Sequence, residues 1–460
     1  MLFRGGIFMS AAVSLIEEFN SFFTDNILCF LLLFTGIFLT FKTRFVQVRF
    51  FLQGLKNTFG GIIKKEKTDG ISPFAALATS LAAQLGTGNI VGAGSAIILG
   101  GPGAVFWMWF SAFFGMATAY SEAVLAQKTR KVTDSKDFTG GAAYYIKYAF
   151  SGKKGQYLAG VFSLFATVAL GFTGVSVQSN SISSALNEAL NIPAFISGII
   201  LTLAAGVLIL KGTKAIARLS EKTVPCLAFL YTAACLTVII MNIKYIPKAF
   251  YLIFSCAFSP EALFGGITGI SIKTALTQGI KRGLFTNEAG MGSTPSAHAL
   301  SDAKNPHYQG TLGMAGVFID TFLLLTLTAL AIISVLYTKS TPPDPTLSGS
   351  EAVTLAFSSV FGQKGAALFI AFSIMFFAFA SILGWNLFGS SSAVFLFGKK
   401  SEKLYTVSSL IFVFLGCIFP GQLVWALTDL FNTLMVLTNI PALIKLSKEI
   451  QTEANFDKNC

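Results

Sequence analysis

Two short segments rich in glycine and polar residues interrupt apolar stretches of the chain. They are GTGN at 86–89 and NEAGMGS at 287–293. Backbone that leaves a helix within the hydrocarbon layer of a membrane has unpaired N–H and C=O groups, which are costly unless something polar meets them. A bound ligand or ion can do so. We therefore interpret both segments as helix breaks that form a binding site, with close packing at Gly88 and Gly92 as the alternative.

The composition places these segments in a membrane protein. Of 460 residues, 53% are hydrophobic and only 12% are charged, too few charges to cover soluble domains. The same figures exclude a disordered chain, a collagen and a secreted disulfide scaffold. The six cysteines form no C-x-x-C pair, so neither a metal site nor a disulfide framework is indicated. In such a protein the net charge of +12 concerns membrane orientation, and we expect no nucleic-acid partner.

Eleven stretches are apolar and long enough to be candidate membrane spans. We predict an all-α polytopic membrane protein with spans near 24–41, 71–99, 102–127, 155–187, 193–210, 223–242, 264–299, 310–337, 364–397, 404–419 and 422–441.

The lysines and arginines predict the orientation of these spans, because cytoplasmic connections are enriched in both residues. If the basic connection 42–67 lies inside, most of the 33 lysines and arginines fall inside. Five fall outside: Arg4, Lys244, Lys248, Lys339 and Lys364. We therefore predict a multi-pass protein of the inner cell membrane, with its N-terminus outside and its C-terminus in the cytoplasm. The mixed segment 45–59 suits a helix along the inner interface.

The two breaks occupy matching positions. With the first span set aside, ten spans divide into two halves of five, and each break lies in the first span of its half. Such a pattern is typical of transporters built as inverted repeats, which bind substrate near the bilayer midplane. We predict an N-terminal segment with the first span and a basic interfacial segment (1–70), two five-helix repeats (71–242 and 243–441) and a cytoplasmic tail (442–460).

The spans also carry charged residues that are expensive in a membrane. Four charged residues of the seventh span should face protein or water, with Lys281 and Arg282 in a solvated vestibule: Lys273, Lys281, Arg282 and Glu288. Glu122 and Asp320 are isolated acids in the third and eighth spans. For these two, a paired structural acid and a role in ion coupling are equally open.

Several motifs together resemble the alanine or glycine:cation symporter family. They include GTGNI (86–90), GGPGAVFWMW (100–109), VQSNSIS (177–183) and NEAGMGS (287–293), and the resemblance runs from about Phe41 to Ile440. It implies an amino-acid transporter with one extra N-terminal helix and a leucine-transporter-like five-plus-five arrangement, which moves alanine, glycine or a close relative with Na⁺. Its partners would be the amino acid, a monovalent cation and the bilayer, without an organic cofactor or an obligate protein partner.

The resemblance also implies a substrate site. The first break would receive the substrate carboxylate, the second would offer carbonyls to its ammonium group, and a tryptophan would close over its side chain. The residues are Thr87, Gly88 and Asn89 at the first break, Gln178 facing it, Phe285, Asn287 and Gly290 at the second, and Trp385.

For the ion, the resemblance implies oxygens near Gly86 and on the helix before ILGW (382–385). The family usually has two adjacent hydroxyl residues there, whereas this chain has Ala380 and Ser381. One hydroxyl is therefore missing from the expected Na⁺ site. A second departure follows the tryptophan, where Leu387, Phe388 and Ser390 replace an aromatic pair and an acid, which would change substrate size or preference.

The alternatives are a membrane enzyme, a channel and a proton-coupled transporter. A membrane enzyme would display paired metal ligands or a nucleotide fingerprint, but the only histidines are His298 and His307, without an H-E-x-x-H motif, and Val91 takes a glycine that the fingerprint requires. A channel would need a ring-forming selectivity sequence, which neither half of the chain contains. A proton-coupled amino-acid transporter of the same fold stays open.

Overall fold

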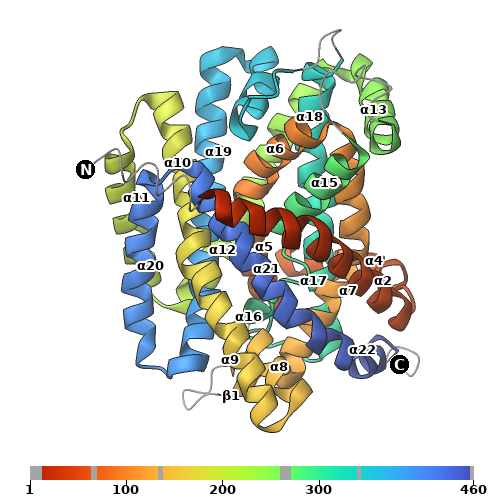
Figure 1. The fold of residues 1–460 in the computed structure, drawn as a ribbon, viewed down its shortest axis with the longest axis vertical. Coiled ribbons are helices and arrows are strands. Elements are labelled where there is room, and N and C mark those ends of the chain that lie inside the picture. Colours follow the sequence, from red (N-terminus) through yellow and green to blue (C-terminus); the bar gives the residue numbers. More distant parts are fainter. Residues whose placement is uncertain (1–12, 64–69, 133–137, 260–270, 339–342, 456–460) are drawn as a thin grey trace.

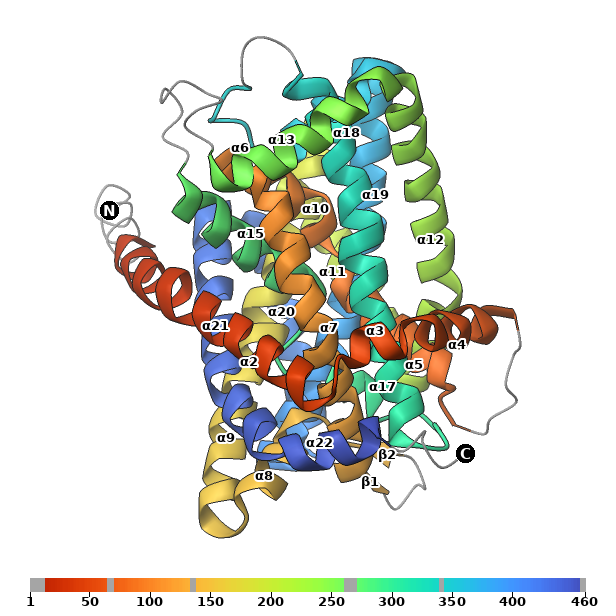
Figure 2. The ribbon, with the colours of Figure 1, turned by 90° about the vertical axis from the view of Figure 1, so that its right-hand side faces the viewer.

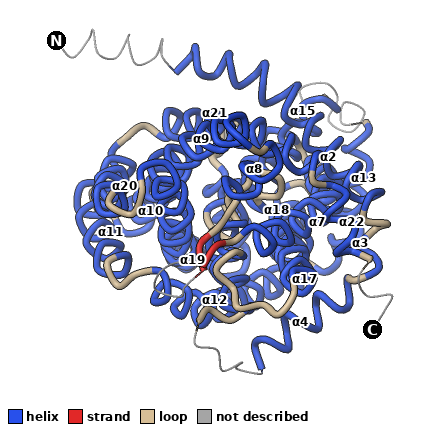
Figure 3. The backbone as a smooth tube through the Cα atoms, turned by 90° about the horizontal axis from the view of Figure 1, so that it is seen from below, coloured by secondary structure: helices blue, strands red, loops and turns tan. Residues whose placement is uncertain are grey.

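The computed structural model describes residues 13–63, 70–132, 138–259, 271–338 and 343–455. Within these ranges the chain is mostly helical, and the two strands β1 (Lys131–Val132) and β2 (Phe138–Thr139) form one short antiparallel pair. Figure 1 shows the long helices packed side by side in a bundle. In the end view of Figure 3 the strand pair lies near the middle of one end of this bundle.

All eleven predicted spans coincide with helices, where η denotes a 3₁₀ or π helix. In chain order they are η1 (Phe23–Leu28) with α2 (Cys29–Lys42), α5 (Pro73–Gln84) with η2 (Thr87–Asn89) and α6 (Val91–Gly100), α7 (Gly103–Thr129), α9 (Gly152–Val168) with η3 (Ala169–Gly174) and α10 (Val175–Leu190), α11 (Ala194–Ile209), α12 (Thr213–Met241), α15 (Ile272–Asn287) with α16 (Pro295–His298), α17 (Pro306–Val317) with η5 (Phe318–Leu325) and α18 (Thr326–Leu336), α19 (Gly349–Phe397), α20 (Ser401–Ile418) and α21 (Gly421–Lys445).

By length and composition, seven helices of the described residues can cross a membrane, and the bent pair α5–α6 makes an eighth. The polytopic all-α class is thereby confirmed, whereas the number of eleven spans stays a prediction. The start of the seventh predicted span, 264–270, lies outside the described residues, and so do 456–460 of the predicted tail.

The remaining helices lie in connections that were not predicted to be helical, apart from α3 and α4, which fall in the predicted interfacial segment. They are α3 (Val46–Arg49), α4 (Phe51–Ile63), α8 (Ala142–Phe150), η4 (Ile243–Tyr245), α13 (Ile246–Phe258) and α22 (Ser447–Ala454). Figure 2 shows α4 lying across the bundle rather than along it, with Leu52 and Phe59 exposed. This position agrees with a helix at the membrane interface.

Two helix boundaries differ clearly from their predictions. The ninth span was predicted to begin at 364, but α19 begins at Gly349 and bends at Gly362, where φ is 70°. The sixth span was predicted to begin at 223, but α12 begins at Thr213. Lys214, Arg218 and Lys222 interrupt the apolar stretch, so a hydropathy reading stops there. Lysine and arginine are nevertheless good helix formers, and the helix continues through them.

The first break separates α5 from α6 by a bend of 55°. Ser72 caps the start of α5 by accepting a hydrogen bond from the Ala75 N–H, and Pro73 takes the first helical position. A Cβ atom at Gly88 would lie 2.7 Å from Cβ of Thr286 on α15. Only glycine therefore lets the first break approach the second broken helix this closely.

The second break follows α15. Glu288 takes the left-handed conformation at φ 56°, and Gly290 and Gly292 follow at φ 89° and 81°. Glycine adopts such angles without the steric cost that a side chain adds, which explains the spacing of the two glycines. The chain resumes helical structure at Pro295. Both predicted interruptions are confirmed.

Candidate functional site

The first break lies against residues from two other helices. The Thr87 N–H donates to Gln178 Oε1 of α10 at 3.1 Å. A Cβ atom at Gly86 would lie 2.5 Å from Ser381 Oγ of α19 and 2.8 Å from Gln178 Oε1. The structure thus brings together four of the residues that the sequence predicted for the substrate and the ion.

Ser381 connects α19 to the end of α5. Its hydroxyl lies 2.7 Å from the Ala82 carbonyl oxygen, 2.9 Å from that of Ala83 and 3.3 Å from that of Phe377. The last carbonyls of a helix have no partner within the helix and carry its partial negative charge. Three carbonyl oxygens and a hydroxyl oxygen at one point form a set of hard ligands that suits a small cation.

Ala380 contributes less to this cluster. It is partly exposed, whereas Ser381 is fully buried. Adjacent residues of a helix point about 100° apart, because 3.6 residues make one turn. The structure therefore brings the Ser381 side chain to the first break and leaves the methyl group of Ala380 beside it.

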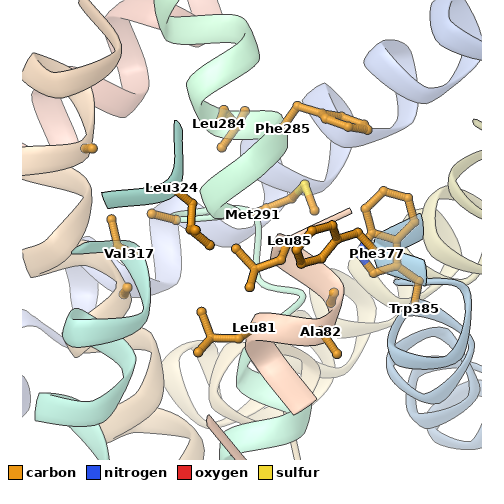
Figure 4. Packing of buried hydrophobic residues seen from close by; sticks show 14 of the residues in the cluster. Leu81, Ala82, Leu85, Leu284, Phe285, Met291, Val317, Leu324, Phe377 and Trp385 are labelled. Carbon is orange, nitrogen blue, oxygen red and sulfur yellow. The ribbon is translucent and has the colours of Figure 1, made fainter. Parts of the chain in front are cut away.

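Trp385 lies one turn further along α19 and is buried. Its indole N–H donates to Glu288 Oε1 at 2.7 Å, and Glu288 also accepts a hydrogen bond from Ser293. The Phe285 ring stands perpendicular to the indole, with centroids 5.8 Å apart. Figure 4 shows Leu85 of the first break, Phe285, and Trp385 of α19 gathered around one apolar region. An aromatic wall therefore adjoins both breaks.

The second break is held by a carboxylate. Glu122 of α7 accepts hydrogen bonds from the N–H groups of Gly290 at 3.1 Å and Gly292 at 2.9 Å. It also accepts from Asn439 Nδ2 at 2.8 Å, and the same amide donates to the Gly290 carbonyl at 3.1 Å. Gly290 was predicted to offer its carbonyl to the substrate, but both of its backbone polar groups have partners within the protein.

Asn287 is similarly engaged. Its carbonyl accepts from Gln84 Nε2 at 2.8 Å, its Oδ1 accepts from the Ala289 N–H at 3.1 Å, and its Nδ2 donates to Thr321 Oγ1 at 3.3 Å. The Gln84 contact ties the end of α5 directly to the end of α15. Asn287 therefore lies at the junction of the two breaks, where it supports their geometry.

A second acid lies between the breaks. Asp320 of η5 accepts hydrogen bonds from Asn89 Nδ2 at 2.6 Å and from the Thr286 hydroxyl at 3.0 Å, both on Oδ1. Its Oδ2 accepts from the Thr321 hydroxyl at 2.9 Å. Asn89, which was predicted to bind substrate, therefore contacts Asp320, whose role the sequence left open. Gln84, Thr286 and Asn439 were not predicted at all, because a single polar residue in a span has no distinguishing pattern.

Two cations of the seventh span, Lys281 and Arg282, face protein and a cavity, as expected, whereas Lys273 is exposed. Lys281 Nζ lies 2.7 Å from Asp429 Oδ2, and the Arg282 guanidinium lies 3.8 Å from Asp429 Oδ1 and 4.6 Å from the Trp425 ring centroid. These four residues line a cavity of about 440 Å³. The Trp425 ring packs on Phe285 of the aromatic wall, with ring centroids 4.8 Å apart, so Trp425 lies between that cavity and the wall.

Two further cavities lie along α19. One of about 340 Å³ is lined by Ile374, and one of about 460 Å³ is lined by Asn386. Ile374 and Asn386 are twelve residues apart on α19, which corresponds to about 18 Å along the helix. Between these positions lie Phe377, Ser381 and Trp385, all buried. The two cavities therefore lie on opposite sides, along α19, of the part of the helix that carries Ser381 and Trp385.

Comparisons with known proteins agree with this architecture. Residues 9–458 match the sodium:alanine symporter family. The chain is 37% identical over 442 residues to the sodium/alanine symporter AgcS of Methanococcus maripaludis, covering 96% of each protein. It is 38% identical over 436 residues to the probable sodium/glutamine symporter GlnT of Bacillus subtilis, covering 94% of this chain and 88% of GlnT.

Among solved structures, MhsT in complex with L-phenylalanine matches with a TM-score of 0.59 at 15% identity, covering 83% of this chain and 90% of MhsT. At this identity the likeness shows the fold, and it agrees with the predicted leucine-transporter-like arrangement. The family match spans nearly the whole chain, and the relatives span it at similar identity. The chain therefore belongs to the sodium:alanine symporter family and is a secondary transporter.

Proposed function

We propose that the chain imports a small neutral amino acid, alanine or glycine, by symport with Na⁺. The observation that carries the proposal is the cluster of oxygens around Ser381 at the end of α5, beside Gly86 and Gln178. A cation bound there would lie next to the free end of the first broken helix. The family description and the name of AgcS support both the ion and the amino acid.

The relatives are named for different substrates, since GlnT is named for glutamine at an identity similar to that of AgcS. The aromatic wall favours a small side chain. Trp385 is closely packed, since a Cβ atom at Gly174 would lie 2.5 Å from its ring and the Phe285 ring stands perpendicular to it at 5.8 Å. An indole fixed in this way leaves little room for a long side chain.

We predict that Trp385→Ala lets larger aliphatic amino acids compete with alanine for uptake. The lost wall should weaken alanine or glycine binding by about 1–3 kcal/mol, the scale of apolar pocket discrimination. Competition profiles in proteoliposomes measure this effect. Trp385→Phe is the matched control, because it keeps an aromatic wall of smaller size and loses the indole N–H group that donates to Glu288. An unchanged profile for Trp385→Ala would place the indole outside the pocket.

We predict that Ser381→Ala raises the Na⁺ concentration for half-maximal uptake far more than it changes alanine affinity at saturating Na⁺. The reverse change is Ala380→Thr, which restores the second hydroxyl of the family pattern and should tighten Na⁺ dependence by on the order of 1 kcal/mol, one hydrogen-bond-scale ligand. Initial uptake rates over a series of Na⁺ concentrations measure both. Uptake insensitive to both substitutions would argue against this ion site.

Proton coupling is the alternative within the same fold. Three buried acids could carry a proton: Glu122, Glu288 and Asp320. None of them forms an ion pair with a lysine or arginine of the described residues. Alanine uptake into proteoliposomes, driven by an imposed Na⁺ gradient and then by an imposed H⁺ gradient, distinguishes the two. Accumulation driven by Na⁺ alone supports the proposal, and accumulation that follows only the proton gradient overturns it.

We further propose that the N-terminus faces outside and the C-terminus the cytoplasm, on the distribution of lysine and arginine. Cysteine labelling in intact cells tests this orientation. A cysteine introduced at Lys244 should react with a membrane-impermeant reagent, whereas one at Lys214 should not.

A further inference from the structure

Two helices that lie across the bundle, α4 and α13, occupy matching places in the chain, and we call them the crosswise helices. Among the described helices, α4 is the one before α5 and α13 is the one before α15, so each precedes a half of a broken span. Figure 2 shows α13 and α15 above α4 and α5, so the two pairs reach the breaks from opposite ends of the bundle. Both crosswise helices expose large apolar side chains: Leu52 and Phe59 on α4, and Tyr251 and Phe254 on α13.

The first crosswise helix joins α5 to α17. A Cβ atom at Gly61 of α4 would lie 2.7 Å from Cβ of Phe74 at the start of α5. A Cβ atom at Gly54 would lie 2.8 Å from the Thr311 carbonyl oxygen of α17, and Asn57 Nδ2 donates to Thr311 Oγ1 at 3.1 Å. The helix α4 therefore contacts a half-helix of the first predicted repeat and the second span of the other predicted repeat.

The second crosswise helix makes the equivalent contacts. It packs on α15, a half-helix of the second predicted repeat, and on α7, the second span of the first. A Cβ atom at Gly103 of α7 would lie 2.5 Å from the Ala257 nitrogen of α13, and Trp107 Nε1 donates to the Ala257 carbonyl at 3.3 Å. Each crosswise helix is thus held on the opposite repeat by one close approach at a glycine and one side-chain hydrogen bond.

A secondary transporter opens its binding site at one end of the bundle while the other end stays closed. We propose that the crosswise helices are two matched clamps, with α4 holding α5 closed at one end and α13 holding α15 closed at the other. Opening of an end then requires its crosswise helix to move away from α17 or from α7. Loosening one clamp should therefore favour opening of that end alone.

Each end has a cavity whose wall can report its opening. The 460 Å³ cavity is lined by Asn386 and by Leu300, which packs against Ile71 just before α5, so it marks the end held by α4. The 340 Å³ cavity is lined by Ala371 and by Ser350 near the start of α19, a helix that contacts α6. Since α6 ends just before the contact of α7 with α13, this cavity marks the other end. Asn386 and Ala371 are both buried, and a cysteine at either position should react faster when its end opens.

The experiment measures how fast a hydrophilic thiol reagent modifies Asn386→Cys or Ala371→Cys in the purified full-length protein, without Na⁺ or amino acid. Mass spectrometry of the modified peptide distinguishes each position from the six natural cysteines. The clamps are loosened one at a time by Asn57→Ala on α4 and by Trp107→Phe on α7. We expect Asn57→Ala to raise the rate at 386 about fivefold and Trp107→Phe to raise the rate at 371 about fivefold, the scale of one hydrogen bond, with no rise at the other position.

Two matched controls lose a similar donor elsewhere. Asn187 donates to the Ile192 carbonyl, and Trp109 donates to Thr326 of α18 rather than to α13, so Asn187→Ala and Trp109→Phe should leave both rates unchanged. Rates that rise at both positions in each clamp variant, or at neither, would overturn the proposal. The labelling needs neither ion nor substrate, so its result is independent of the proposed function. The expected pattern together with an absence of Na⁺-driven uptake would support the clamps and overturn only the proposed function.

Discussion

Asn89→Leu is expected to abolish amino-acid uptake while the protein still inserts into the membrane. The substitution removes a buried amide from the first break and one hydrogen bond from Asp320. Leucine suits a membrane helix, so insertion should stay near normal. A binding site that loses a required polar group commonly loses roughly 100-fold or more in activity. Uptake of labelled alanine, normalised to the amount of inserted protein, measures the effect.

A matched control for this exchange is Asn187→Leu. Asn187 is an exposed residue of α10 whose amide donates to the Ile192 carbonyl, away from both breaks. It should retain uptake, because it contacts neither the oxygen cluster nor the aromatic wall. Normal uptake by Asn89→Leu would contradict the placement of the substrate at the first break.

The breaks could be predicted from the sequence because their cause is local. Gly86 and Gly88 interrupt an apolar run, and Gly290 and Gly292 take backbone angles that favour glycine. The partners that satisfy the freed backbone could not be predicted in the same way. Asn439 is a single amide in a late span, and only the tertiary fold brings it to Gly290.

The candidate site was predictable to a different degree. Gln178 and Ser381 were expected through the family motifs, and the structure places both beside Gly86. Motifs do not show which groups are already engaged, so the Gly290 carbonyl was expected to be free. The acids Glu122 and Asp320 were visible as expensive residues, but their spacing in sequence does not indicate which break each one meets.

Glu122→Leu is expected to cause the largest loss of stability. Three donors then lose their acceptor within the buried core: the N–H groups of Gly290 and Gly292 and the amide of Asn439. Each unpaired buried donor costs about 1–3 kcal/mol, so the total for three donors is roughly 3–9 kcal/mol. Thermal melting of the purified protein, followed by size-exclusion chromatography, should show a marked fall in Tm. Uptake should also be lost, because the second break no longer keeps its shape.

Two further variants make this prediction specific. Glu122→Gln keeps the shape and one acceptor oxygen, so its loss of stability should be smaller than that of Glu122→Leu. Glu188→Leu exchanges an acid that lines the 340 Å³ cavity and should change the Tm little. Asn439→Leu breaks the same network, and its effect should not add fully to that of Glu122→Leu, since residues of one network couple. Full additivity, or an unchanged Tm for Glu122→Leu, would show that the second break is held by other contacts.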